Sequence, residues 1–118
     1  MKKVLIADDA QFMRLSLRKI LEKNGFEVIA EAADGIEAIS KFRTANPDII
    51  TMDLTMPEMN GIEAIRQIKK LKKDVNIIVI SAMGNMSCVY DAVAAGACGF
   101  IVKPFKEEDV VKSLSRLL

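Results

Sequence analysis

Five short runs of apolar residues recur along the chain and begin near positions 4, 26, 48, 75 and 99. In the clearest of them, residues 4–7, 49–52 and 77–80, apolar side chains follow one another almost without interruption. A strand with one solvated face alternates apolar and polar residues, whereas a parallel strand that is covered on both faces is nearly continuous. The pattern therefore predicts five buried parallel strands.

The segments between these runs carry apolar residues three or four positions apart, which is helical spacing. The five stripes consist of Met13, Leu17, Ile20 and Leu21; of Ile36, Ile39 and Phe42; of Ile62, Ile65 and Ile68; of Met86, Val89 and Val93; and of Val110, Val111, Leu114, Leu117 and Leu118. Alternating strands and helices indicate an α/β fold with helices on both faces of a parallel sheet. We expect residues 1–118 to form a single domain with no output domain.

The most reactive side chains of the chain follow directly on the apolar runs. The first run ends in Asp8 and Asp9, the third in Asp53, the fourth in Ser81 and the fifth in Lys103. In open parallel sheets, ligands bind outside the carboxyl ends of the strands, at the point where the strand order reverses. The sequence therefore predicts one site built from three carboxylates, one hydroxyl and one ammonium group.

The same residues select one of the doubly wound topologies. In the order 3-2-1-4-5 of dinucleotide-binding folds, strands 1 and 3 are not neighbours, so Asp8 and Asp9 would lie far from Asp53. In the flavodoxin-like order these strands flank the switch point, and the ends of strands 4 and 5 lie beside them. We therefore predict a flavodoxin-like, doubly wound (βα)5 fold whose five-stranded parallel sheet has the order 2-1-3-4-5.

Composition narrows the classes of protein that fit. The chain is 51% hydrophobic and 28% charged, and its formal net charge of +1 creates no bulk field that favours nucleic acid or an anionic membrane. No apolar run approaches the roughly 18 residues of a membrane-spanning helix. The N-terminal run is too short for a signal peptide, so we expect a cytoplasmic protein.

Two residue types limit the chemistry further. The chain has no histidine, which excludes a phosphohistidine and a histidine metal ligand, so a phosphoryl group has to come from another molecule. Cys88 and Cys98 match no zinc or redox spacing. We expect both thiols to be reduced and to act as small apolar filler.

Three carboxylates at one edge of a sheet require a compensating charge. Two carboxylates about 5 Å apart repel by roughly 3 kcal/mol at an effective dielectric constant of about 20. The cluster must therefore raise a pKa, recruit Lys103 or bind a cation. Mg2+ suits one or two carboxylates together with water and a phosphate, although these residues alone leave Ca2+ and Mn2+ open. An aspartate carboxylate can also attack phosphorus and form an acyl phosphate.

The motifs at the strand ends resemble those of the receiver domains of two-component response regulators. They are Asp8-Asp9, the segment MDLTMPEMNG at positions 52–61, Ser81-Ala82 and Lys103-Pro104-Phe105. The resemblance covers the chain in order and spacing, and within the family the chain looks most like the stand-alone chemotaxis regulators. It implies a protein that takes a phosphoryl group from a sensor histidine kinase, catalyses its own phosphorylation and dephosphorylation, and signals by altered protein binding.

The resemblance also implies which residues hold the metal and the phosphoryl group. Asp53 would be the phosphoacceptor. Asp9, Asp53 and the backbone carbonyl of Thr55 would bind Mg2+ directly, and Asp8 would act largely through water. Lys103 would pair with the phosphoryl oxygens.

Two further residues would couple phosphorylation to the surface of the protein. By the resemblance, Ser81 would donate a hydrogen bond to the phosphoryl group, although a serine at this place can also simply cap the next helix. Phe100 occupies the position of the family's aromatic switch, although a phenylalanine in a buried strand can also serve only as core. It lacks the hydroxyl of the tyrosine that often stands there. The bond between Lys103 and Pro104 is expected to be cis.

The partners that the resemblance implies are a sensor histidine kinase as phosphodonor, a flagellar motor switch protein or another downstream protein as target, and a phosphatase. The face formed by the fourth helix, the fifth strand and the fifth helix would bind the target. We expect a monomer that binds neither nucleic acid nor a membrane. The alternative is a stand-alone receiver in a phosphorelay outside chemotaxis.

Other classes of protein also place an aspartate at the end of a strand. A phosphohydrolase of the haloacid dehalogenase type needs a second aspartate two residues after the nucleophile, where this chain has Thr55, and a cap domain. A flavodoxin-like binder of a nucleotide or flavin needs a loop of backbone donors after the first strand, where Asp8 and Asp9 would repel a phosphate. A receiver that works without phosphorylation is a third alternative, which the intact set of acids disfavours.

Overall fold

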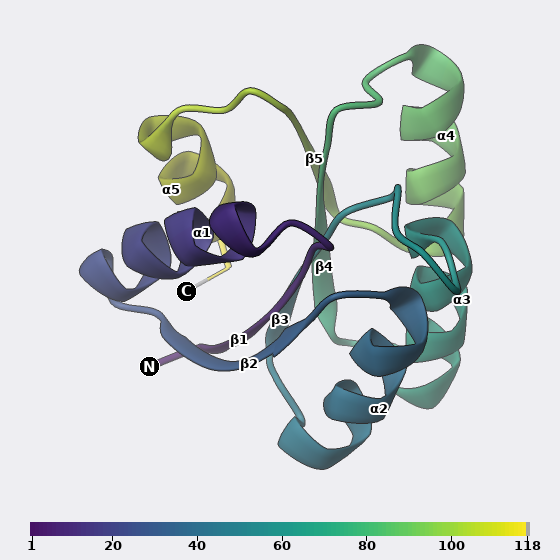
Figure 1. The fold of residues 1–118 in the computed structure, drawn as a ribbon, viewed down its shortest axis with the longest axis horizontal. Coiled ribbons are helices and arrows are strands. Elements are labelled where there is room, and N and C mark those ends of the chain that lie inside the picture. Colours follow the sequence, from purple (N-terminus) through teal and green to yellow (C-terminus); the bar gives the residue numbers. More distant parts are fainter. Residues whose placement is uncertain (118) are drawn as a thin grey trace.

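Five parallel strands form one sheet at the centre of the structure, a computed structural model that describes residues 1–117 (Figure 1). The strands are β1 (Lys3–Ala7), β2 (Glu27–Ala32), β3 (Ile49–Met52), β4 (Asn76–Ser81) and β5 (Gly99–Val102). They pair in the order β2-β1-β3-β4-β5, and every adjacent pair is parallel. The predicted flavodoxin-like α/β fold and its strand order are confirmed.

Helices cover both faces of this sheet. They are α1 (Gln11–Lys23), α2 (Gly35–Ala45), α3 (Gly61–Leu71), α4 (Met86–Ala95) and α5 (Glu107–Ser115). The chain first moves from β1 outward to β2 and then returns past β1 to β3, β4 and β5. Because crossovers between parallel strands are right-handed, this reversal places α1 on one face and α2, α3 and α4 on the other, and α5 returns to the side of α1 (Figure 1).

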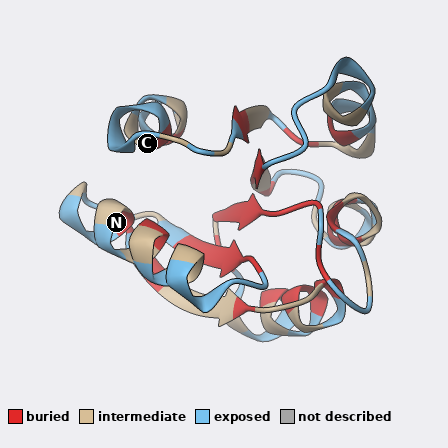
Figure 2. Cartoon of the chain, turned by 45° about the horizontal axis from the view of Figure 1, so that its top comes forward, coloured by how far each residue is buried: buried red, intermediate tan, exposed pale blue. Residues whose placement is uncertain are grey.

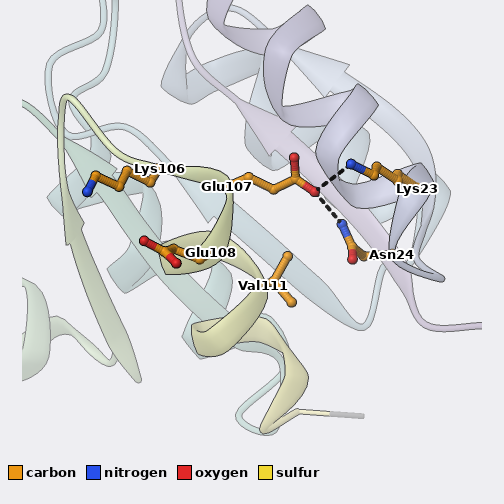
Figure 3. Close-up of a pocket in the computed structure, with 6 residues that line it drawn as sticks. All are labelled: Lys23, Asn24, Lys106, Glu107, Glu108 and Val111. Atoms are coloured by element: carbon orange, nitrogen blue, oxygen red, sulfur yellow. Dashed lines mark hydrogen bonds and ion pairs between the residues drawn. The ribbon is translucent and has the colours of Figure 1, made fainter.

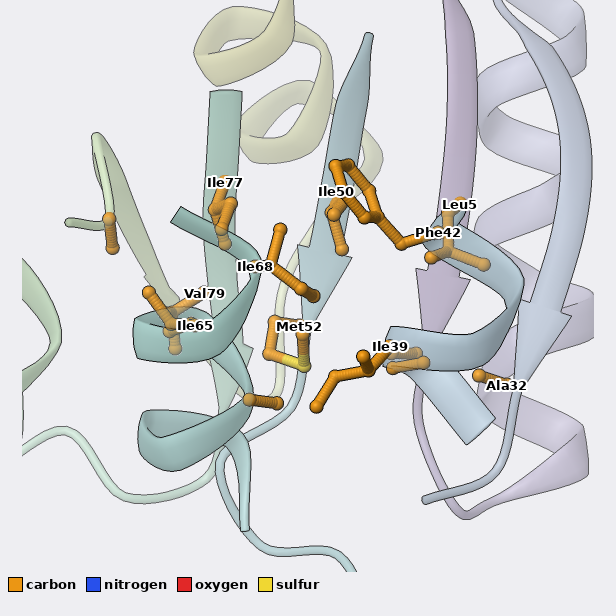
Figure 4. Packing of buried hydrophobic residues seen from close by; sticks show 14 of the residues in the cluster. Leu5, Ala32, Ile39, Phe42, Ile50, Met52, Ile65, Ile68, Ile77 and Val79 are labelled. Carbon is orange, nitrogen blue, oxygen red and sulfur yellow. The ribbon is translucent and has the colours of Figure 1, made fainter. Parts of the chain in front are cut away.

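The core consists of two apolar layers, one on each face of the sheet. The layer beneath α1 and α5 includes Val4, Ile6, Leu17, Leu21, Ile49 and Ile78. The layer beneath α2, α3 and α4 includes Leu5, Ile50, Met52, Ile65, Ile68 and Ile77 (Figure 4). Successive residues of a strand point to opposite faces, so the runs 4–7, 49–52 and 77–80 of the three inner strands are buried along their length, as predicted (Figure 2). The edge strands β2 and β5 are only partly buried, and Val102 at the end of β5 is 47% exposed.

Most of the predicted helix stripes face this core. Leu17 and Leu21 of α1 and Ile65 and Ile68 of α3 are buried. In α5 the buried residues include Leu114, whereas Leu118 lies outside the described residues. Polar side chains cap three of the helices. Asp34, Asn60 and Asn85 accept hydrogen bonds from the backbone N–H groups of Glu37, Glu63 and Cys88, respectively.

The predicted inward face of α4 is wrong. Met86 and Val93 are 81% and 57% exposed, and the helix instead packs on the core through Cys88, Ala92 and Ala95. Both sets of residues have helical spacing, so periodicity alone does not distinguish them. The residues with small side chains face inward because they let α4 lie close to α3 and to the sheet.

Two smaller predictions of burial also need correction. Ile36 is 53% exposed because the inward stripe of α2 runs through Gly35, Ala38, Ile39 and Phe42, which lie on one face of the helix. Cys98 is exposed in the turn between α4 and β5, so it is not core filler, whereas Cys88 is half-buried. Both thiols are free. None of the five helices in residues 1–117 is long and apolar enough to cross a membrane.

The orientation of α4 predicts opposite responses at two adjacent positions. Ala92 is fully buried, so Ala92→Val forces two methyl groups into filled space and should lower the free energy of unfolding by about 1–3 kcal/mol. Val93 is exposed, so Val93→Ala should change it by no more than about 0.5 kcal/mol. Urea unfolding of the two variants measures both effects, and a larger loss in Val93→Ala would contradict this orientation.

Candidate functional site

Asp8 and Asp53 are neighbours because the strands that precede them are paired. Ala7 of β1 lies opposite Met52 of β3 in the parallel register, so the next residue of each strand emerges at the same edge of the sheet. The backbone N–H of Asp53 donates to the carbonyl of Ala7 over 2.9 Å, which extends the pairing by one residue. The strand order therefore places these two carboxylates side by side.

Asp9 completes a cluster of three acids. Asp8, Asp9 and Asp53 each offer a carboxylate oxygen, and these oxygens lie within 4.8 Å of one another. Asp8 and Asp53 are 2% and 6% exposed, whereas Asp9 is exposed, so the cluster is open to solvent on the side of Asp9. The predicted convergence of the three acids is confirmed.

Lys103 contacts the two buried acids directly. Its Nζ lies 2.7 Å from Oδ2 of Asp8 and 3.6 Å from Oδ2 of Asp53. The backbone N–H of Lys103 also donates to the carbonyl of Ser81, which fixes the chain after β5 against the end of β4. The bond from Lys103 to Pro104 is cis, as expected.

Burial is the main cause of a raised pKa at Asp53, and the charges of Asp8 and Asp9 raise it further. The charge of Lys103 and a hydrogen bond from the backbone N–H of Thr55, 3.4 Å long, oppose this rise without cancelling it. Lys103 supplies one positive charge to three carboxylates. The oxygen donors and the excess negative charge therefore fit a small, hard divalent cation.

Ser81 lies at the end of β4 and is fully buried. Its Oγ accepts a hydrogen bond of 3.2 Å from the backbone N–H of Met83. The N-cap of α4 is Asn85, whose side chain accepts from the backbone of Cys88, so Ser81 does not cap this helix. Thr55 is exposed, and its hydroxyl donates to Sδ of Met83, which joins the loops after β3 and β4.

Phe100 lies on β5 opposite Val79 and is half-buried against the core beneath α2, α3 and α4. The structure thus unites Asp8, Asp9, Asp53 and Lys103 in one cluster and places Ser81 at the end of the strand that pairs with β5. Phe100 belongs to the core layer beside them.

Sequence reasoning missed two residues that support this cluster. Arg14 of α1 donates from Nη1 to the backbone carbonyl of Asp8 over 2.6 Å, and its Nε lies 3.1 Å from Oε1 of Glu31. Arg14 is an ordinary polar residue on an amphipathic helix, and nothing in its spacing from Asp8 signals a contact. A role for Glu31 follows only from the pairing of β2 with β1.

Gly61 allows the loop after β3 to approach the start of α3. A Cβ at this position would lie 2.2 Å from the backbone oxygen of Asp53, which no side chain tolerates. The N–H of Gly61 donates to the carbonyl of Leu54 over 3.0 Å. The segment that carries Asp53 and Thr55 is therefore held against the first turn of α3.

Two surface hollows differ in their relation to the acids. One, of about 330 Å³, is lined in part by Leu54 and Thr55, which follow Asp53 in the sequence, and by Met83. A larger hollow of about 580 Å³ lies between α1 and α5 and includes none of the cluster residues (Figure 3). In this hollow Glu107 of α5 forms an ion pair with Lys23 of α1 over 3.2 Å and accepts a hydrogen bond from Asn24. These exposed contacts join the two helices.

Comparison with known proteins agrees with this geometry. Residues 4–115 match the family model of the response regulator receiver domain. The chain belongs to this family. Receiver domains bind Mg2+ at an acidic pocket, and Asp8, Asp9 and Asp53 form such a pocket here.

The individual relatives include chemotaxis proteins. This receiver domain is 50% identical over 116 residues to the chemotaxis protein CheY of Bacillus subtilis (strain 168), and the match covers 98% of this chain and 97% of that protein. It is 53% identical over 116 residues to CheY of Thermotoga maritima, with the same coverage of 98% and 97%. A solved CheX–CheY–BeF3–Mg2+ complex from Borrelia burgdorferi has a TM-score of 0.94 at 39% identity, and the match covers 99% of this chain and 90% of that one.

Removing the charge of Asp53 should stabilise the receiver domain in the absence of metal ions. Asp53→Asn keeps the shape of the side chain and removes one of three crowded charges, so the free energy of unfolding near pH 7 in EDTA should rise by about 1–2 kcal/mol. Because the pKa of Asp53 is raised in the folded state, ionisation of this group lowers stability as the pH rises through that pKa.

The difference between variant and wild type should therefore shrink as the pH falls and Asp53 becomes protonated. Urea unfolding at several pH values measures it. Asp74→Asn, at an exposed position, is the control and should change stability by no more than about 0.5 kcal/mol. Equal stability of Asp53→Asn and wild type near pH 7 would contradict the electrostatic account.

Proposed function

We propose that this protein is a phosphorylation-activated response regulator of chemotaxis. It takes a phosphoryl group from a sensor histidine kinase onto Asp53, with Mg2+ bound, and signals by altered binding to the flagellar motor switch. The observation that carries the proposal is the cluster of three carboxylates within 4.8 Å, with Lys103 against it, in a receiver domain.

The proposed metal ligands are Asp9, Asp53 and the backbone carbonyl of Thr55, and Asp8 acts through water. Mg2+ held by these residues would neutralise the charge that accumulates at this edge of the sheet. An oxygen of Asp53 attacks the phosphorus of the kinase phosphohistidine, the P–N bond breaks, and an acyl phosphate forms. The same set of residues holds the acyl phosphate while water slowly hydrolyses it.

Lys103 and Ser81 respond to the new group. A phosphoryl group adds a charge of about −1.5 to −2 and three acceptor oxygens. It competes with Asp8 for the ammonium of Lys103, which lies only 3.6 Å from Oδ2 of Asp53. Oγ of Ser81 accepts a hydrogen bond from the backbone N–H of Met83, so its hydroxyl proton is available for donation to a phosphoryl oxygen.

A movement of Ser81 reaches the surface through Met83. The backbone N–H of Met83 donates to Ser81, and the sulfur of Met83 accepts from Thr55. The loop after β4 and the loop after β3 therefore meet at Met83. Met83 precedes α4, whose outer face exposes Met86 and Tyr90. We infer that this face, with β5 and α5, binds the target, and that Phe100 repacks as part of the switch.

The role in chemotaxis is supported by the two CheY relatives, each at least 50% identical to this chain. We propose a cytoplasmic monomer in which residues 1–118 form one receiver domain. A CheX-like protein and a phosphatase are candidate partners, whereas the net charge of +1 offers nothing to nucleic acid or membranes.

A stand-alone receiver in a phosphorelay outside chemotaxis is the alternative, and it would use the same chemistry with another target. Binding of the phosphorylated and unmodified protein to the motor switch protein of the same cell separates the two. Tighter binding after phosphorylation supports chemotaxis, and the absence of binding in both states favours the alternative.

Asp53 should be the site of covalent phosphorylation. Incubation with acetyl phosphate and Mg2+ should add one phosphoryl group to the intact mass of the wild type, and EDTA should prevent it. Asp53→Asn should remain unmodified because an amide oxygen is a poor nucleophile. Asp74→Asn should react as the wild type does. Labelling that persists in Asp53→Asn would place the nucleophile elsewhere and overturn the assignment.

Lys103→Arg should separate phosphorylation from signalling. Asp53 and the metal ligands remain, so the variant should still accept a phosphoryl group. The planar guanidinium cannot occupy the position of a compact ammonium, so the coupling to Ser81 should fail. Amide chemical shifts from Ala82 to Met86 and at Phe100 should change on phosphorylation in the wild type and much less in the variant. Full wild-type shifts in Lys103→Arg would contradict this role of Lys103.

A further inference from the structure

Asp8 is fixed through every polar group that it carries. Its backbone N–H donates to the carbonyl of Ala32, and its Oδ1 accepts from the backbone N–H of Ala10, both over 2.9 Å. Its Oδ2 accepts from Lys103, and its backbone carbonyl accepts from Nη1 of Arg14 over 2.6 Å. Three of these contacts come from the sheet edge or the adjacent loop, and the fourth comes from a side chain on α1.

The start of α1 lacks the usual means of fixing a helix to the preceding loop. Its N-cap is Ala10, which has no polar side chain, and no acidic residue lies in the first turn. The first backbone bond of the helix runs from Arg14 to the carbonyl of Ala10. The side chain of Arg14 then reaches back six residues to Asp8, so it joins the helix to the loop that carries Asp8 and Asp9.

Arg14 is itself held by the neighbouring strand. Glu31 of β2 places Oε1 3.1 Å from Nε of Arg14, and its Oε2 lies 2.8 Å from Nε of Arg18. The guanidinium group of Arg14 thus donates one hydrogen bond to Glu31 and another to Asp8. The same end of β2 contacts Asp8 directly through Ala32 and indirectly through Glu31 and Arg14.

We propose that Arg14, held by Glu31, is a positioning residue that orients the Asp8-Asp9 segment for binding of the divalent cation. This inference rests on the proposed function because it concerns the same metal site. Arg14 bonds to the backbone carbonyl of Asp8 and not to its carboxylate, whose oxygens accept from Ala10 and Lys103, so Arg14 blocks neither carboxylate oxygen. Residues that orient metal ligands typically change metal affinity by 10–100-fold when they are replaced.

The chain offers a matched control in Arg18. Both arginines lie on α1, bond to Glu31 through Nε and carry one positive charge, but the bond to Asp8 comes from Arg14. Loss of a positive charge beside the acids should by itself strengthen binding of a cation. Weaker binding in an Arg14 variant therefore reports lost orientation and not lost charge.

Mg2+ titrations of Arg14→Gln, Arg14→Lys and Arg18→Gln, followed by calorimetry, test the proposal. Both Arg14 variants should raise Kd for Mg2+ by about tenfold, because lysine keeps the charge but cannot reach both partners, and Arg18→Gln should stay within about twofold of the wild type. Equal values of Kd in Arg14→Gln and Arg18→Gln would overturn the proposal. If Arg14→Gln does not fold, the comparison of Arg14→Lys with Arg18→Gln decides in the same way.

A second measurement needs no metal. The backbone N–H of Ala10 donates to Oδ1 of Asp8, so its hydrogen exchange in EDTA reports how firmly that carboxylate is held. Exchange at Ala10 should be faster in Arg14→Gln than in Arg18→Gln, and equal rates would count against the positioning role. Failure of the wild type itself to bind Mg2+ would instead remove the proposed function, while this comparison would still test the orientation of Asp8.

Discussion

The carboxylates of Asp8, Asp9 and Asp53 lie within 4.8 Å of one another, and one ammonium, that of Lys103, is in contact with them. This imbalance of charge is the constraint on which the rest of the site depends. Burial and the neighbouring acids raise the pKa of Asp53 despite Lys103, so the folded protein holds a carboxylate in an unfavourable position. A divalent cation would relieve that cost, and an aspartate held in this way is suited to phosphoryl chemistry.

Strand pairing and short backbone contacts hold these charged residues together. Asp8 and Asp53 follow paired strands, and the β-sheet register fixes the separation of their backbones. The turn after Asp53 can close only because residue 61 is glycine. On the other side, Arg14 reaches back from α1 to the carbonyl of Asp8, so a helix without a polar N-cap is still fixed to the loop.

Met83 connects the acidic site to the exposed face of α4. Met83 lies in the loop after β4, where its backbone N–H donates to Ser81. Its sulfur accepts from Thr55, which links this loop to the loop after β3 that carries Asp53. Beyond it, α4 packs inward through small residues and leaves Met86 and Tyr90 in solvent. Such an exposed apolar face is suited to a partner that binds one conformation better than another.

The sequence by itself determined the α/β class, the strand order and the identity of the clustered acids, because strand ends in a parallel sheet must meet at one edge. It did not determine which face of α4 is buried, since Met86 and Val93 have the same helical spacing as Cys88, Ala92 and Ala95. Nor did it reveal Arg14 as a partner of Asp8. Both depend on how closely separate elements approach, and only tertiary packing decides that distance.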